Sequence, residues 1–268
     1  MDDFHDMLAD DALADDALVR RVEEVRQRLV DALVEHDELE CRICPELESV
    51  YQKKVGAHEY ELFEAQLQLE QAKRRVQLVK ESLAGGVVPS LPRIEHRMRE
   101  EMADELQNLS DRHAFLALMQ SATRMSDDEE AELGRLYRIC LERLHPDLHP
   151  RYPERAKNLF LYARNVYTRG DLRKMEGYVI LSREPFSAHL PRYSAREAAD
   201  QVALWELQIE FARADIDETK ANHPYSERDF LEDDALVEQA VANLDELVRE
   251  FREECSWYEM ECRALLGS

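Results

Sequence analysis

Glycine and proline are scarce in this sequence of 268 residues, which contains only 7 glycines and 9 prolines. These counts are about 2.6% and about 3.4% of the chain, whereas average proteins contain about 7% glycine and about 5% proline. β-Sandwiches, β-barrels and glycine-rich nucleotide-binding sheets all depend on many tight turns, and tight turns need these two residues. The composition therefore argues against all three architectures.

Long apolar runs are lacking too, because no stretch approaches the roughly 20 residues that a membrane-spanning helix needs. The residues from Met1 to Asp6 supply neither the basic nor the apolar region of a secretory signal. The sequence also contains no P-loop, no HExxH motif and no nucleophile elbow. We therefore expect a cytoplasmic protein that is not an enzyme, has no catalytic residues, no cofactor and no bound metal, and does not bind membranes.

Positive charge is in deficit, with 35 lysines and arginines against 58 aspartates and glutamates, so the net charge is −23. Because such a protein repels polyanions, nucleic acid is not an expected partner. Hydrophobic residues make up 44% of the chain and charged residues 35%, a combination typical of long amphipathic helices and coiled coils. The predicted fold class is all-α, with long antiparallel coiled-coil helices and an inserted helical hairpin.

The apolar pattern predicts where these helices lie. A stripe with steps of four and three residues runs from Leu18 to Ile43, and Pro45 should kink it. The turn at 85–92 should fold the next helix back antiparallel on the first. The predicted parts are a disordered N-terminus, N-terminal helical arms, a compact module, a linker and a C-terminal helical hairpin, at residues 1–14, 15–125, 126–182, 183–194 and 195–268.

The compact module has the clearest local signals. Ser126 and Glu129 form a capping-box pattern that predicts a helix over about 127–144. Two prolines within 145–150 exclude a continuing helix, and a second helix is expected from about Pro153 to Arg169, ended by Gly170. The module is therefore predicted to be a pair of antiparallel helices joined by a His-Pro-Asp turn.

This module resembles the J domain of DnaJ-type co-chaperones over about residues 127–175. The turn reads His145-Pro146-Asp147, and the flanking helices carry apolar and aromatic residues at the spacing of that family, namely Leu133, Tyr137, Phe160, Ala163, Val166 and Tyr167. The resemblance implies that these six residues form the core of the helical pair. It also implies that the turn triggers ATP hydrolysis in a DnaK-type chaperone, so that this chain catalyses nothing itself.

The charge of the module fits that resemblance. The segment from Arg135 to Lys174 has ten basic and four acidic residues, a net charge of +6, within a chain whose remaining residues carry −29. Such a patch attracts an acidic partner surface. By the resemblance, the chaperone-binding residues are the turn itself with Arg135, Arg138 and Arg143.

The sequence also departs from the family. The segment 115–122 lacks the Tyr-Tyr-x-x-Leu type of motif that opens the first J-domain helix, and Cys140 stands where the family usually has leucine. No Gly/Phe-rich linker and no set of four CxxC zinc repeats follows the module. The function predicted from the resemblance is a co-chaperone or adaptor whose arms bind a protein client or self-associate. The alternative is a structural coiled-coil scaffold whose J-like hairpin no longer stimulates a chaperone.

Simpler interpretations remain open for several residues. The His-Pro-Asp tripeptide can be only an interhelical turn. His36 lies on the apolar stripe, which favours a core or interface position over a metal ligand. Four cysteines could form a zinc site if the first and last arms meet, although buried packing is the favoured interpretation; these are Cys41, Cys44, Cys255 and Cys262.

Overall fold

The computed structural model describes residues 16–121, 125–183, 186 and 194–267, and most of these residues are helical, with no β-strand among them. The predicted disordered segment 1–14 lies outside the described residues, as does most of the predicted linker 183–194. None of the described helices combines the length and apolarity that crossing a bilayer requires.

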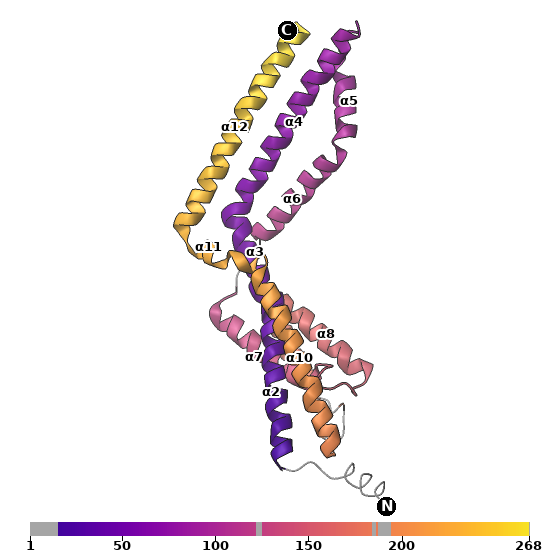
Figure 1. The fold of residues 1–268 in the computed structure, drawn as a ribbon, viewed down its shortest axis with the longest axis vertical. Coiled ribbons are helices and arrows are strands. Elements are labelled where there is room, and N and C mark those ends of the chain that lie inside the picture. The colour runs from indigo at the N-terminus through magenta and orange to yellow at the C-terminus, as the bar shows by residue number, and fades with distance from the viewer. Residues whose placement is uncertain (1–15, 122–124, 184–185, 187–193, 268) are drawn as a thin grey trace, which may run out of the picture. The chain divides into compact units, whose positions relative to one another are not determined.

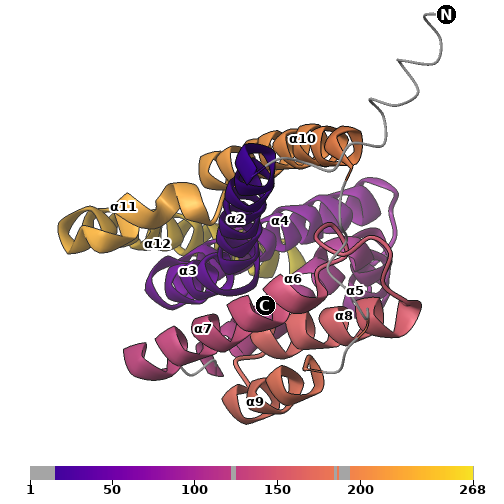
Figure 2. The ribbon, with the colours of Figure 1, turned by 90° about the horizontal axis from the view of Figure 1, so that it is seen from below.

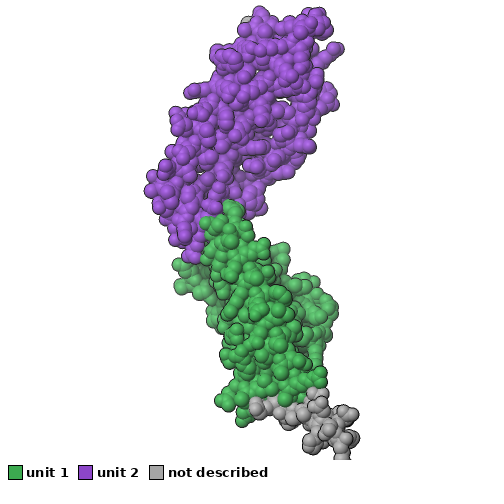
Figure 3. Space-filling model, in the orientation of Figure 1, with its two compact units in different colours: residues 1–46, 123–226 green, residues 47–122, 227–268 purple. Residues whose placement is uncertain are grey.

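The chain divides into two compact units (Figure 3). Unit 1 contains residues 1–46 and 123–226, and unit 2 contains residues 47–122 and 227–268. This division differs from the predicted one, because each of the two predicted arm regions contributes to both units. The apolar stripes of the long helices explain it, since α2 packs along α10 in unit 1 while α4 packs along α12 in unit 2.

Unit 1 is built from α2 (Asp16–Glu38), α7 (Asp127–Leu144), α8 (Glu154–Thr168), α9 (Leu172–Leu181) and α10 (Ala195–Ala221). The helices α7, α8 and α9 pack on one another, as Figure 2 shows, and α2 contacts both α7 and α10. One apolar core joins these helices, with side chains such as Leu29, Leu141 and Met175 fully buried.

Unit 2 has α4 (Ala57–Ala84) in the middle of its long helices (Figure 1). On one side lie α5 (Leu91–Glu101) and α6 (Ala103–Ser121), and on the other lies α12 (Asp234–Leu266), which follows the short α11 (Arg228–Glu232). Ring contacts between Tyr60 and His113, and the ion pair between Arg74 and Glu101, show that α5 and α6 run antiparallel to α4. The fold-back predicted at the turn 85–92 is therefore confirmed.

The helices pair in parallel across both long interfaces, and this corrects the predicted antiparallel arms. In unit 1, Arg21 bonds Glu206 and Glu35 bonds Lys220, so residue numbers rise together along α2 and α10. In unit 2, Lys54 meets Asp234, and Lys80 meets Glu261. A short turn forces two helices to run antiparallel, but the partners here are joined by long intervening segments and no such constraint applies.

Pro45 does not end the first helical stretch, which continues from α2 through α3 (Cys44–Tyr51) to α4. A π-helical turn, Leu39–Ile43, precedes the proline, and the Cys44 N–H bonds the Leu39 carbonyl five residues earlier. A proline inside a helix lacks a donor and its ring clashes with the preceding turn, so kinks and π-turns often accompany it. A second π-helical turn, Gln52–Gly56, lies between α3 and α4.

Candidate functional site

The turn between α7 and α8 holds the His145-Pro146-Asp147 tripeptide, and all three residues are half-buried. The helix α7 ends at Leu144, and His145 adopts an extended conformation before the proline. The backbone N–H of Asp147 donates to Nδ1 of His145 at 3.2 Å, and the ring of His145 meets Phe160 edge-on with centroids 4.7 Å apart. Burial lowers the pKa of His145, so the imidazole is neutral with Nδ1 as an acceptor and the proton on Nε2.

The helix α10 covers this turn through one buried tryptophan. Nε1 of Trp205 donates to the backbone carbonyl of Asp147 at 3.1 Å, and the Trp205 side chain is buried in the core of unit 1. The contact uses only the backbone of Asp147. Its carboxylate makes no hydrogen bond and no ion pair with any part of the chain that the structure describes.

The three arginines predicted to bind a chaperone lie on α7, and each has a partner within unit 1. Arg135 bonds Glu132 one turn earlier and its side chain stays exposed. Arg138 bonds Asp31 of α2 and also Glu142. Arg143 donates to the Val179 carbonyl and to the Ser182 hydroxyl at the end of α9. The positive charge of Arg138 is therefore largely offset by two carboxylates, whereas Arg143 has no acidic partner among the described residues.

The six residues predicted to form the core of the helical pair are all buried, namely Leu133, Tyr137, Phe160, Ala163, Val166 and Tyr167. The rings of Tyr137 and Tyr167 stack 4.1 Å apart at 6°. Because Tyr137 lies against Tyr167 while His145 lies against Phe160, α7 and α8 run antiparallel. Burial raises the pKa of the Cys140 thiol in this core to about 11, so the thiol is protonated and packs as a small apolar group.

A buried carboxylate, Asp37 of α2, ties this helical pair to the rest of unit 1. It accepts hydrogen bonds from the Tyr137 hydroxyl and, at 2.9 Å, from Nε of Arg164 on α8, while His36 lies beside it at 3.4 Å. Burial works to raise the pKa of Asp37, but the hydrogen bonds from His36 and Tyr137 and the charge of Arg164 outweigh it, and the pKa is lowered. Asp37 is therefore ionised and compensated at neutral pH.

Sequence reasoning missed Asp37, although a signal was present. It lies seven residues after Val30, which is fully buried, and so occupies the same face of the helix. A charged residue at a core position of an amphipathic helix indicates a partner of opposite charge, which here is the half-buried Arg164.

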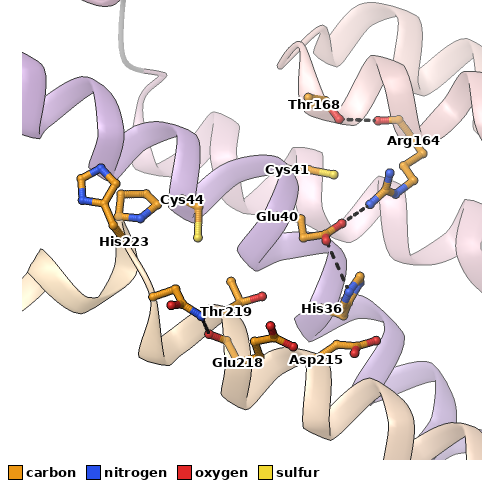
Figure 4. A pocket seen from close by; sticks show the side chains of 12 residues that line it. His36, Glu40, Cys41, Cys44, Arg164, Thr168, Asp215, Glu218, Thr219 and His223 are labelled. Atoms are coloured by element: carbon orange, nitrogen blue, oxygen red, sulfur yellow. Dashed lines mark hydrogen bonds and ion pairs between the residues drawn. The ribbon is translucent and has the colours of Figure 1, made fainter.

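A groove of about 700 Å³ opens next to this cluster (Figure 4). It is lined by His36 of α2, by Glu40 and Cys41 of the π-helical turn and by Cys44 of α3. Asp215 and Glu218 of α10 and Arg164 of α8 complete the lining described here. Nη2 of Arg164 also bonds Glu40 at 2.6 Å. The hydrogen bond to Asp37 raises the pKa of His36, which favours a charged imidazole beside the acidic groups.

The groove does not suit a metal ion or a redox thiol. His36, Asp37 and Glu40 place possible ligand atoms within 4.8 Å of one another, but the guanidinium of Arg164 already occupies both carboxylates. A cation there would have to displace it. Burial raises the pKa of Cys41 and of Cys44, so neither thiol has the low pKa of a redox-active cysteine.

The other two of the four cysteines considered as zinc ligands belong to unit 2. Cys262 is buried and Cys255 is half-buried. The thiol of Cys255 lies 3.7 Å from the Gln68 carbonyl. Burial raises the pKa of both thiols. Cys255 and Cys262 thus pack within the helices of unit 2, whereas Cys41 and Cys44 line the groove of unit 1.

The chain has no counterpart in the comparisons with known proteins. No protein-family model matches it, no curated protein matches it, and no solved structure matches it. A functional assignment therefore rests on the residues and geometry described above.

Proposed function

We propose that this protein is a helical adaptor that engages a DnaK-type chaperone through a J-like helical pair, α7 and α8. The observation that carries the proposal is the Asp147 carboxylate, which has no partner among the described residues although it lies in a turn held by other bonds. A charged group kept free in an ordered turn is available to a partner protein.

The geometry around the turn supports a specific orientation of this contact. His145 is held against Phe160, its Nδ1 accepts from the backbone, and its protonated Nε2 is left as a donor. Arg135 on the preceding helix is exposed and pairs only locally, with Glu132. Arg143 bonds the Ser182 hydroxyl and has no acidic partner among the described residues. The partner surface would therefore be acidic, with a hydrogen-bond acceptor for Nε2 of His145 and a donor for the Asp147 carboxylate.

A second candidate is a structural scaffold in which the J-like pair only builds the fold. Two contacts favour it: Trp205 bonds the backbone of the turn, and Asp31 of α2 bonds Arg138, so that the surface a chaperone would need is partly used within unit 1. A turn that is half-buried is also less accessible than one at an open tip. This candidate predicts that the wild-type protein does not stimulate any chaperone.

The two candidates are separated by single-turnover ATP hydrolysis with the DnaK-type chaperone of the same organism. The co-chaperone proposal predicts stimulation by the wild-type protein and its loss in Asp147→Asn. This variant is the sharpest one, because the carboxylate makes no hydrogen bond or ion pair with the described residues, so its replacement should leave folding stability nearly unchanged.

The matched control is Asp104→Asn, which removes the same charge from an exposed position on α6. It should stimulate as well as the wild type does. Absence of stimulation by folded wild-type protein, or equal stimulation by the wild type and Asp147→Asn, contradicts the co-chaperone proposal and leaves the scaffold. Trp205→Phe keeps an aromatic ring but removes the bond to the turn, and it is expected to increase stimulation if α10 restrains the turn.

A further inference from the structure

The outer face of α10 carries an exposed apolar stripe that no described element of unit 1 covers. Leu204, Leu207 and Phe211 are 47%, 46% and 60% exposed and follow one another in steps of three and four residues. The opposite face of α10, with Trp205, Ile209 and other residues, is buried against α2 and the core. This helix is therefore apolar on two faces, and only one of them has a partner within unit 1.

The same stripe continues into the groove described above. Steps of four and three from Phe211 lead to Asp215 and then to Glu218, and both line the groove together with His36 of α2 (Figure 4). The carboxylates of Asp215 and Glu218 make no hydrogen bond or ion pair within the described residues. The stripe thus has apolar residues along its first part and unpaired acidic groups at its C-terminal end.

We propose that this face of α10 binds an amphipathic helix of a basic partner protein. The apolar side chains of that helix would pack on Leu204, Leu207 and Phe211, and one of its lysines or arginines would pair with Asp215 and Glu218. Helices recognised in grooves present anchors at three- and four-residue spacing, which is the spacing of this stripe. The basic end of the partner would lie toward the C-terminus of α10.

Charge selects this occupant over a second copy of the chain. The helix α10 has seven acidic and three basic residues, and the whole chain carries −23. Two copies meeting through this face would bring like charges together, which disfavours association. Charge also excludes residues 1–15 of the chain as the occupant of this face, because they contain six aspartates and neither lysine nor arginine.

This binding face is distinct from the turn of the proposed function and does not depend on it. The test uses the full chain and a fluorescein-labelled peptide of leucine and lysine, with leucines at three- and four-residue spacing. A second peptide has glutamate in place of every lysine. Fluorescence anisotropy at physiological salt should show saturable binding of the lysine peptide, one per chain, and no binding of the glutamate peptide.

The variants distinguish docking on the stripe from general attraction to an acidic protein. The double variant Leu207→Ser with Phe211→Ser keeps the charge and should weaken binding by about tenfold or more. Its matched control, Trp257→Ser with Met260→Ser, removes two exposed apolar residues from α12 and should bind like the wild type. Because all four side chains are exposed, thermal unfolding should be nearly unchanged.

The acidic end is tested in the same way. Asp215→Asn with Glu218→Gln should weaken binding more than Glu250→Gln with Glu253→Gln, which removes the same charge from α12. Equal losses in the two charge variants, equal losses in the two apolar variants, or equal binding of both peptides would overturn the proposal. Chaperone stimulation does not enter this assay, so its result is independent of the proposed co-chaperone activity.

Discussion

Asp37 stabilises unit 1 because side chains from three helices, namely His36, Tyr137 and Arg164, contact its carboxylate. Removing one member of a buried ion pair leaves the other without compensation, which destabilises a protein far more than the loss of an exposed pair does. Asp37 is only 5% exposed, whereas Asp31 on the same helix is exposed and pairs with Arg138 at the surface. The two carboxylates therefore make a matched comparison on one helix.

Asp37→Asn should lower the free energy of unfolding of unit 1 by about 2 kcal/mol, because the Tyr137 hydroxyl and Arg164 lose a charged acceptor while Arg164 keeps Glu40. Asp31→Asn should lower it by less than about 1 kcal/mol, as exposed pairs do. Urea denaturation followed by circular dichroism measures both. Equal effects of the two substitutions would show that the Asp37 contacts do not stabilise the native state.

His145 makes the stability of unit 1 dependent on pH. Burial lowers the pKa of both His145 and His149 below 6.5, so both prefer the neutral form in the folded state. Their stabilising contribution is present above the unfolded pKa of 6.5 and is lost as the pH falls through the folded values. The raised pKa of His36 acts in the other direction, since its contribution is present below 6.5 and is lost as the pH rises.

His145→Gln is therefore expected to flatten the fall in stability between pH 6.5 and pH 5. Each proton taken up by the unfolded state but not by the folded state contributes up to about 1.4 kcal/mol per pH unit, so this slope should fall by at most that amount. The measurement is the unfolding free energy at several pH values. His96→Gln, at an exposed site on α5, serves as the control and should keep the wild-type slope.

The ends of individual helices follow from local signals in the sequence. Ser126 accepts from the Glu129 N–H while the Glu129 carboxylate accepts from the Ser126 N–H, and α7 begins at the next residue, as the capping-box pattern predicted. Gly170 adopts a positive φ after α8, again as predicted. These features depend on residues within one or two turns, which is why the sequence alone locates them.

Ser126→Ala should destabilise unit 1 by about 1 kcal/mol, because the Glu129 N–H at the start of α7 loses the Ser126 hydroxyl as its acceptor. Ser256→Ala is the control, since this hydroxyl within α12 bonds the Arg252 carbonyl of its own helix. It should be neutral or slightly stabilising. Thermal unfolding of the two variants measures both effects. A loss of stability in Ser256→Ala as large as that in Ser126→Ala would contradict the capping explanation.

The direction in which helices pair could not be predicted from the sequence in the same way. The turn at 85–92 fixes α5 antiparallel to α4, and that prediction is confirmed. For α2 and α10 the stripes of Val25 and Ile209 show only that each helix buries one face, and an apolar stripe packs equally well on a parallel or an antiparallel partner. The groove, which is lined from both α2 and α10, depends on that pairing and so could not be predicted either.

At the scale of the whole molecule, each unit has a core of its own. The core of unit 1 includes Leu141 and Phe160, and that of unit 2 includes Val79 and Ile94. Because the two clusters share no residue, a cavity in one core should open its own unit first.

Val79→Ala should therefore increase amide hydrogen exchange within residues 47–122 and 227–268, and Leu141→Ala should do so within residues 16–46 and 125–226. Each truncation is expected to cost about 2–4 kcal/mol, with the valine at the lower end. Exchange measured by mass spectrometry resolves the two regions. Faster exchange throughout the chain in either variant would show that the units unfold as one.

The parallel pairing of α2 with α10 has a consequence for biosynthesis. Arg21 meets Glu206, a partner 185 residues further along the chain. At about 5–20 residues per second, the ribosome needs roughly 10–40 s to deliver that partner after the first helix has emerged. During this interval the apolar stripe of the nascent helix remains uncovered, so we expect the newly made chain to be most vulnerable to aggregation before its last third is translated.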